Sequence, residues 1–119
     1  MLIQIVDDNP NMRGAIKSVL GGLGAKFIES TDGDEAVSDF LSGKPDLVLM
    51  DILMVRVDGI TAMKAILRES PEAKVIIVTQ YDDDDLRAAA QRAGAAGYVL
   101  KDDLSQILPF LHSISRGLQ

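Results

Sequence analysis

Leu47-Val48-Leu49-Met50-Asp51 is a run of four apolar residues that ends on a carboxylate. Consecutive apolar residues without alternation are typical of a strand buried on both faces of a parallel sheet. Three further strands of this kind end on polar side chains: Ile3 to Val6 before Asp7 and Asp8, Val75 to Val78 before Thr79, and Tyr98 to Leu100 before Lys101. Ligands of open parallel sheets bind beyond the carboxyl ends of the strands. The sequence therefore predicts that three carboxylates, a hydroxyl and an ammonium group meet at one edge.

Helical spacing separates these strands. Asn9-Pro10 is a good helix start, and the glycines of residues 21–24 end that helix. A second strand is expected over residues 25–29, and a helix after Thr31-Asp32-Gly33 should turn four side chains inward: Ala36, Val37, Phe40 and Leu41. Two more helices are expected, from Ile60 to Ser70 and from Asp82 to Gly94. Repeated strand-helix units predict an α/β fold, a single doubly wound five-stranded parallel sheet with five helices.

The last helix contains a local conflict. Asp102-Asp103 is expected to start it, and five apolar side chains should face inward: Leu104, Ile107, Leu108, Leu111 and Ile114. Pro109 would remove a backbone donor from the interior of such a helix. We therefore expect either a kink or a helix that starts later than Asp103, with Ser105 as its cap.

Composition limits the classes of function. The 119 residues make one domain, and a net charge of −6 with a pI near 4.6 argues against direct nucleic-acid binding. There is no cysteine, which excludes disulfides and zinc-thiolate sites. We expect no signal peptide and no membrane span, and hence a cytoplasmic protein. The chain could be a whole protein or a domain cut at its linker.

Asp7, Asp8 and Asp51 would repel one another at one sheet edge. Each pKa would rise unless a cation were present, and Mg²⁺ prefers such oxygen ligands. Asp51 is then a candidate nucleophile that forms an acyl phosphate, with Lys101 and Thr79 contacting the phosphoryl group. Taken singly, the aspartate pair could merely cap a helix, Lys101 could be a solvated lysine and Thr79 a strand residue.

The motifs resemble the receiver domain of bacterial two-component response regulators along the whole chain. They follow in the family's order: Val6-Asp7-Asp8-Asn9, Leu49-Met50-Asp51-Ile52-Leu53-Met54, Val57-Asp58-Gly59, Val78-Thr79 and Gly97-Tyr98-Val99-Leu100-Lys101. The segments 81–85 and 97–104 are most similar to the NarL/LuxR branch, whose usual C-terminal DNA-binding domain is absent here. The resemblance implies a flavodoxin-like sheet of order 2-1-3-4-5 over residues 1–119.

The resemblance also implies roles for single residues. Asp51 would accept a phosphoryl group from a sensor histidine kinase or a small phosphodonor, and the protein would be a switch rather than a turnover enzyme. Asp8, Asp51 and the backbone carbonyl of Leu53 would bind Mg²⁺, or Mn²⁺ in its place, with Asp7 acting through water. Thr79 and Tyr98 would form the switch pair. Dimers would use helix 82–94, strand Gly97–Leu100 and the last helix, or else the first and last helices.

Three departures from the family pattern bear on activity. Val55 follows Met54 where the family usually has proline, and Gln80 replaces a small residue after the switch threonine. Leu53 and Tyr81 flank the path of an attacking water and should slow loss of phosphate.

Two alternatives stay open. A pseudo-receiver would keep the fold but bind partners without phosphate, and Val55 and Gln80 favour that reading. A Mg²⁺-dependent phosphatase of the haloacid dehalogenase type would need a second aspartate two residues after Asp51, where this chain has Leu53.

Overall fold

The sheet has the predicted strands and order. The computed structural model describes residues 1–54 and 57–117. Its five parallel strands follow the order β2-β1-β3-β4-β5, with bounds β1 (Leu2–Val6), β2 (Lys26–Ser30), β3 (Leu47–Met50), β4 (Val75–Thr79) and β5 (Gly97–Leu100). β3 and β4 are buried along their whole length, which explains their continuous apolar sequence. β2 lies at the edge, and it begins and ends one residue later than the predicted 25–29.

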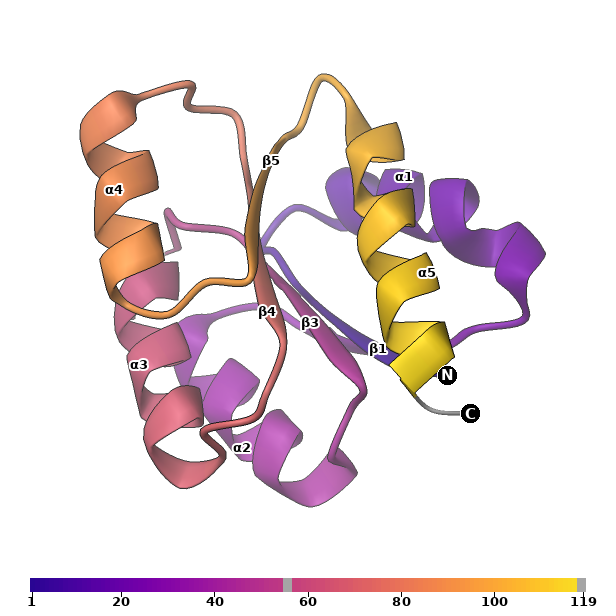
Figure 1. Ribbon diagram of the computed structural model, residues 1–119, viewed down its shortest axis with the longest axis horizontal. Coiled ribbons are helices and arrows are strands. Elements are labelled where there is room, and N and C mark those ends of the chain that lie inside the picture. The colour runs from indigo at the N-terminus through magenta and orange to yellow at the C-terminus, as the bar shows by residue number, and fades with distance from the viewer. Residues whose placement is uncertain (55–56, 118–119) are drawn as a thin grey trace.

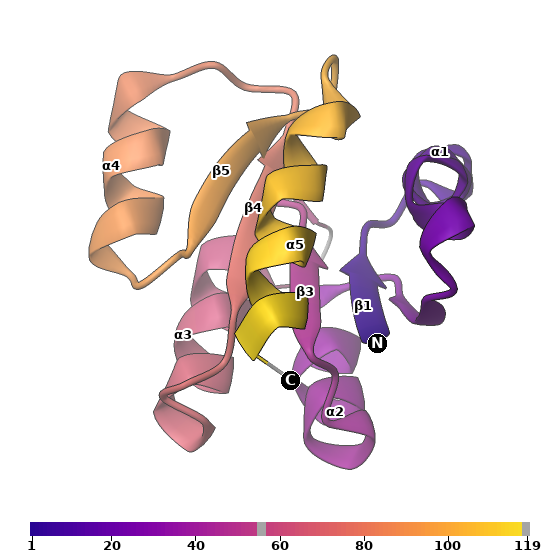
Figure 2. The same ribbon diagram turned by 45° about the vertical axis from the view of Figure 1, so that its right-hand side comes forward.

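Helices cover both faces of the sheet (Figures 1 and 2). α1 (Pro10–Leu20) and α5 (Leu108–Gly117) lie on one face, and α2 (Gly33–Gly43), α3 (Gly59–Glu69) and α4 (Asp84–Arg92) lie on the other. Each face has its own apolar core. Ile16, Leu20 and Leu111 pack on the first, whereas Phe40 and Met63 pack on the second. This arrangement leaves the carboxyl edge of the sheet free for short polar loops.

Side chains cap the first four α-helices, and the cap predicted at Asn9 is confirmed. α3 begins and ends one residue earlier than the predicted 60–70, and α4 is shorter at both ends than the predicted 82–94. The Asn9 side chain accepts a hydrogen bond from the Asn11 backbone N–H at the start of α1. Asp32, Asp58 and Asp83 cap the next three helices in the same way. Because the β1–α1 cap lies directly after Asp7 and Asp8, it fixes the turn that carries them.

Pro109 is accommodated by a later helix start, as expected. A 3-10 helix, η2 (Leu104–Ile107), comes first, and α5 begins at Leu108. Pro109 is therefore in the first turn, where its missing N–H is not needed. The expected cap at Ser105 is wrong, because the Ser105 hydroxyl donates to the Asp103 carboxylate instead.

One inward prediction fails. Leu41 is 47% exposed, although Ala36 and Phe40 on the same helix are buried as predicted. Leu41 lies in the last turn of α2, which ends at Gly43, and its side chain is in contact with solvent there. In the part of the chain that is described, no helix is long and apolar enough to cross a membrane.

Candidate functional site

The parallel sheet brings the predicted site residues to one edge. Asp7 follows β1, Asp51 follows β3, Thr79 ends β4 and Lys101 follows β5. A cavity of about 190 Å³ opens there, and its lining consists of Asp7, Asp8, Asn9, Asp51, Leu53, Gln80, Tyr81 and Lys101. The ends of four strands, which were predicted from separate stretches of sequence, thus meet at one site.

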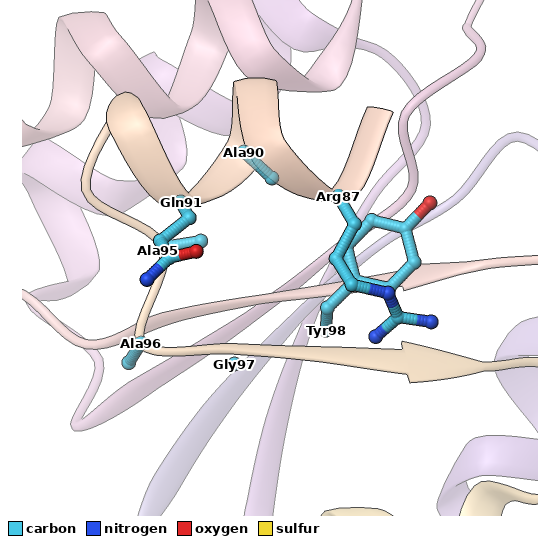
Figure 3. Close-up of a pocket in the computed structure, with 7 residues that line it drawn as sticks. All are labelled: Arg87, Ala90, Gln91, Ala95, Ala96, Gly97 and Tyr98. Carbon is cyan, nitrogen blue, oxygen red and sulfur yellow. The ribbon is translucent and has the colours of Figure 1, made fainter. Parts of the chain in front are cut away.

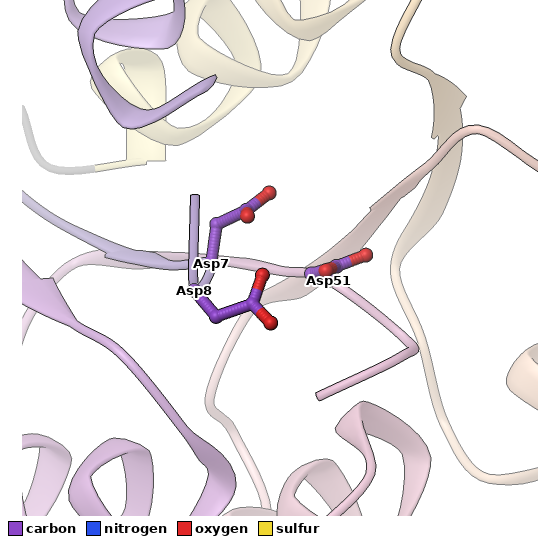
Figure 4. A group of neighbouring side chains, drawn as sticks. All are labelled: Asp7, Asp8 and Asp51. Atoms are coloured by element: carbon purple, nitrogen blue, oxygen red, sulfur yellow. The ribbon is translucent and has the colours of Figure 1, made fainter. Parts of the chain in front are cut away.

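Three carboxylates gather in this cavity (Figure 4). One oxygen from each of Asp7, Asp8 and Asp51 lies within 4.8 Å of the others. Asp7 and Asp51 are buried, whereas Asp8 is exposed. Within the described residues, the Asp8 carboxylate has no hydrogen-bond or ion-pair partner, so it is open to a ligand from solution.

Lys101 neutralises part of this charge. Its Nζ lies 2.8 Å from Asp7 Oδ2 and 3.4 Å from Asp51 Oδ1. Burial acts to lower the pKa of Lys101, but the hydrogen bond to Asp7 and the charge of Asp51 raise it overall. Lys101 therefore stays a cation beside both carboxylates.

The pKa of Asp51 is unusually high for an aspartate. Burial raises its pKa from 3.8 to about 6, although the charge of Lys101 opposes this and the charge of Asp7 adds to it. A buried carboxylate with two acidic neighbours is stabilised by a further positive charge. Three convergent carboxylates supply the hard oxygen donors that Mg²⁺ prefers, so the residues present fit such an ion.

Asp7 differs from Asp8 because its polar atoms already have protein partners. Its Oδ1 accepts a hydrogen bond from the Asn9 backbone N–H at 2.9 Å, and its Oδ2 pairs with Lys101. Its backbone N–H donates to the Ser30 carbonyl, and its carbonyl accepts from Arg13 Nη1 at 2.7 Å. Asp7 is held firmly, and Asp8 beside it is the freer ligand.

Arg13 is a site neighbour that sequence reasoning missed. Besides contacting the Asp7 carbonyl, its Nε lies 3.0 Å from Glu29 Oε1, and Lys17 Nζ lies 3.0 Å from Glu29 Oε2. Side-chain hydrogen bonds from Lys17 and Arg13 lower the pKa of Glu29. The spacing of Arg13 and Lys17 on one helix face was the available signal, but only the sheet places Glu29 opposite them.

Thr79 lies behind the cavity wall. It is fully buried, and its Oγ1 accepts a hydrogen bond from the Tyr81 backbone N–H at 3.3 Å. The next two residues, Gln80 and Tyr81, line the cavity in front of it. The Thr79 carbonyl also accepts from the Lys101 backbone N–H, which ties the ends of β4 and β5 together.

Tyr98 lies on the side of β5 that faces α4. Its hydroxyl donates to the Tyr81 carbonyl at 2.7 Å, and the Arg87 guanidinium lies 4.4 Å from its ring centroid. Burial raises the pKa of Tyr98, partly offset by the charge of Arg87. Arg87 is the second residue that sequence reasoning missed, because its contact with Tyr98 crosses from α4 to β5.

The departures from the family pattern fall in two places. Leu53, Gln80 and Tyr81 all line the cavity, as their positions in the sequence suggested. Leu53 is 54% exposed. It stands two residues after Asp51, where a phosphatase of the haloacid dehalogenase type would need a carboxylate. Val55 lies outside the described residues.

Gly59 shapes the site from below. A Cβ added to it would lie 1.9 Å from the Asp51 carbonyl oxygen, and its N–H donates to the Ile52 carbonyl at 2.7 Å. The start of α3 therefore touches the backbone of Asp51 directly. In the sequence, Gly59 was singled out only as part of the family resemblance, and this close approach was not predicted.

Known proteins are similar to this chain in sequence and in fold. YxjL of Bacillus subtilis, described as an uncharacterized transcriptional regulatory protein, is 32% identical over 97% of this chain, which spans about half (54%) of that relative's length. The crystal structure of a LuxR-family two-component response regulator from Aurantimonas matches with a TM-score of 0.89 and 28% identity, over 98% of this chain and 85% of that one. A chain of the CheX-CheY-BeF3-Mg complex of Borrelia burgdorferi matches with a TM-score of 0.88 and 26% identity, over 96% of this chain and 88% of that one.

The strand order and the acidic edge define the class of protein: a flavodoxin-like signalling receiver. The model of the response regulator receiver domain matches residues 3–111, and this chain belongs to that family. The resemblance to receivers of LuxR-type regulators is confirmed by the relatives and by the structural neighbour.

Proposed function

We propose that this domain is a phosphorylation-dependent switch and that Asp51 is its phosphoacceptor. The observation that carries the proposal is the position of Asp51, a buried carboxylate in a cavity between Lys101 and an acidic pair. Its raised pKa reflects a carboxylate that gains from a cation and from positively charged neighbours. The transcriptional regulators among its relatives favour control of transcription, through an output domain that is attached or supplied by a partner.

Mg²⁺ is the proposed cofactor, with Mn²⁺ as an alternative. Asp8, Asp51 and the Leu53 carbonyl would hold the ion, and Asp7 would act through water. The free Asp8 carboxylate and the occupied oxygens of Asp7 support this division. When bound, the ion supplies charge neutralisation for the phosphoryl oxygens.

The chemistry is a transfer between a donor and Asp51. A carboxylate oxygen of Asp51 forms a bond to phosphorus, and the bond from phosphorus to the imidazole nitrogen of a histidine kinase breaks, which releases that imidazole. With acetyl phosphate, acetate leaves instead. Lys101, which is already between Asp7 and Asp51, pairs with a phosphoryl oxygen, and the Thr79 hydroxyl donates to another.

The product is expected to persist. Leu53 in the cavity lining offers no group to position an attacking water, and Tyr81 adds bulk to the same lining. The domain therefore acts as a switch that promotes its own phosphorylation and slow dephosphorylation, and not as a turnover enzyme. Its proposed setting is the cytoplasm.

The switched surface is proposed to be that of α4, β5 and α5, or that of α1 and α5. The first candidate adjoins the site through Tyr98, which contacts the loop after Thr79. A sensor histidine kinase and a second copy of the domain are the proposed partners. Direct binding of nucleic acid by this domain is disfavoured by its charge of −6.

Intact mass after incubation with Mg²⁺ and acetyl phosphate or phosphoramidate tests the proposal. We expect the gain of one phosphoryl group in the wild type, none without Mg²⁺ and none in Asp51→Asn. The second candidate function is the pseudo-receiver, favoured by Gln80 in the cavity lining. No gain of mass with either donor would favour that alternative, and Gln80 and Val55 would then be the first residues to revert.

A further inference from the structure

Arg87 joins three elements around the aromatic ring of Tyr98 (Figure 3). From α4, its guanidinium lies over the ring, 4.4 Å from the centroid. Its Nη2 also lies 3.1 Å from Asp82 Oδ1, in the loop before the helix. A guanidinium at this distance from an aromatic face is attracted to it. The ring is thus clamped between β5 and a side chain that is itself anchored by Asp82.

The hydroxyl of the clamped ring reaches the loop that controls Thr79. Tyr98 donates to the Tyr81 carbonyl, and the Tyr81 N–H donates to Thr79 Oγ1. Since Thr79 Oγ1 accepts this bond, its own proton is free for another acceptor. The Tyr81 backbone therefore links the two side chains: its carbonyl accepts from Tyr98, and its N–H leaves the Thr79 hydroxyl able to donate.

The packing beside Tyr98 explains why Arg87 is needed. A cavity of about 270 Å³ lies between α4 and β5, and small side chains dominate its lining: Ala90, Ala95, Ala96 and Gly97, with Gln91, Arg87 and Tyr98. Arg87 belongs to this lining, and its guanidinium covers one face of the ring. Without that cover the ring has room to leave the Tyr81 carbonyl.

We propose that Arg87 is a positioning residue of the phosphoacceptor site, acting through Tyr98 and Tyr81 on Thr79. The inference rests on the proposed function, in which Thr79 donates to a phosphoryl oxygen. Coupling between two sites is reciprocal. Arg87 therefore strengthens binding of a phosphoryl group at Asp51, and that group in turn tightens α4 against β5.

Beryllofluoride, a phosphoryl mimic, tests this with Mg²⁺ present, its bound fraction read from the fluorine resonance. We expect Arg87→Met to weaken its binding by about two- to fivefold, the size of an exposed cation–aromatic contact. Arg87→Lys should recover part of the loss. Arg92→Met, on the same helix and exposed, is the matched control and should bind as the wild type does.

A double-mutant cycle separates this role from a general loosening of the fold. In a Tyr98→Leu background, Arg87→Met should have no further effect, because its route to Thr79 is gone. Equal binding by wild type and Arg87→Met would overturn this inference alone, as would the same loss in both backgrounds. Failure of the wild type itself to bind beryllofluoride would overturn the proposed function and, with it, this coupling.

Discussion

Lys101 Nζ lies closer to Asp7 Oδ2, at 2.8 Å, than to Asp51 Oδ1, at 3.4 Å. The ammonium group therefore makes its stronger contact with the carboxylate that is not the proposed phosphoacceptor. Asp7 is buried, and backbone hydrogen bonds hold it in place, so it keeps Lys101 beside Asp51. Because Lys101 pairs mainly with Asp7, it neutralises the charge of Asp51 only in part. A carboxylate oxygen of Asp51 is therefore available as the acceptor, and the ammonium group of Lys101 is close enough to pair with an incoming phosphoryl group.

Replacement of Lys101 by methionine should raise the pKa of Asp51 further, because the charge of Lys101 is what opposes the effect of burial. The carboxyl carbon resonance of Asp51 in a pH titration measures this. Phosphorylation by acetyl phosphate should also slow by an order of magnitude or more, since loss of one charged donor at such a site costs about 10²-fold in rate. Lys64→Met, an exposed lysine on α3, is the control and should change neither quantity.

Replacement of Asp51 by asparagine should stabilise the metal-free domain at pH 7. The pKa of Asp51 is higher in the folded state, so the folded state binds the extra proton between about pH 4 and 6 and the ionised form is disfavoured above that range. The difference between 3.8 and about 6 corresponds to at most about 3 kcal/mol in the free energy of unfolding. Urea denaturation from pH 4 to 8 measures the gain.

The pH dependence distinguishes this cause from better packing. The advantage of Asp51→Asn should shrink as the pH falls from 7 to 4, because wild-type Asp51 then becomes protonated. Added Mg²⁺ should shrink it at pH 7. An advantage that is constant with pH would mean that ionisation of Asp51 is not its origin.

Replacement of Gly59 by alanine should destabilise the domain and disturb the site together. The new methyl group would lie 1.9 Å from the Asp51 carbonyl oxygen, so the backbone of α3 or of Asp51 must move. We expect a loss of about 2 kcal/mol or more in unfolding free energy, typical of a forced core displacement. Thermal denaturation and acetyl phosphate labelling measure the two effects.

Gly14→Ala is the matched control for that variant. Gly14 is inside α1 and no atom lies within 4 Å of its added Cβ. Alanine there should stabilise the helix by about 0.5–1 kcal/mol and leave labelling unchanged. Similar behaviour of the two variants would contradict the close approach of Gly59 to Asp51.

Replacement of Leu53 by asparagine should speed the loss of phosphate from Asp51. The apolar side chain lines the cavity, and an amide there could position a water for attack. Decay of the phosphorylated protein, followed by intact mass after the donor is removed, should be several-fold slower in the wild type. Leu41→Asn is the control, because Leu41 is an exposed leucine in the last turn of α2 and does not line the cavity. Equal decay in wild type and Leu53→Asn would refute the protective role of Leu53.

The strands and the acidic edge could be predicted because their causes are local. The residues of β3, Leu47 to Met50, are apolar without interruption. Its neighbours β1 and β4 are also mostly apolar and lead to a polar residue, Asp7 and Thr79 respectively. Parallel pairing places Asp7, Asp51 and Lys101 at one edge of the sheet, and the strand order implied by the family resemblance places them close together. Leu41 was misplaced because helical spacing cannot say where the end of α2 leaves the sheet.

The sequence by itself determined the alternation of strands and helices and the carboxylates at the strand ends. Only the tertiary structure decided which partner each polar group takes: Lys101 with Asp7, Arg13 with the Asp7 carbonyl and Glu29, and Arg87 with Tyr98. The physical reason is range. Strand burial, capping and turn formation depend on neighbours along the chain, whereas charge pairs and ring contacts depend on distances between elements that only the packed sheet and helices set.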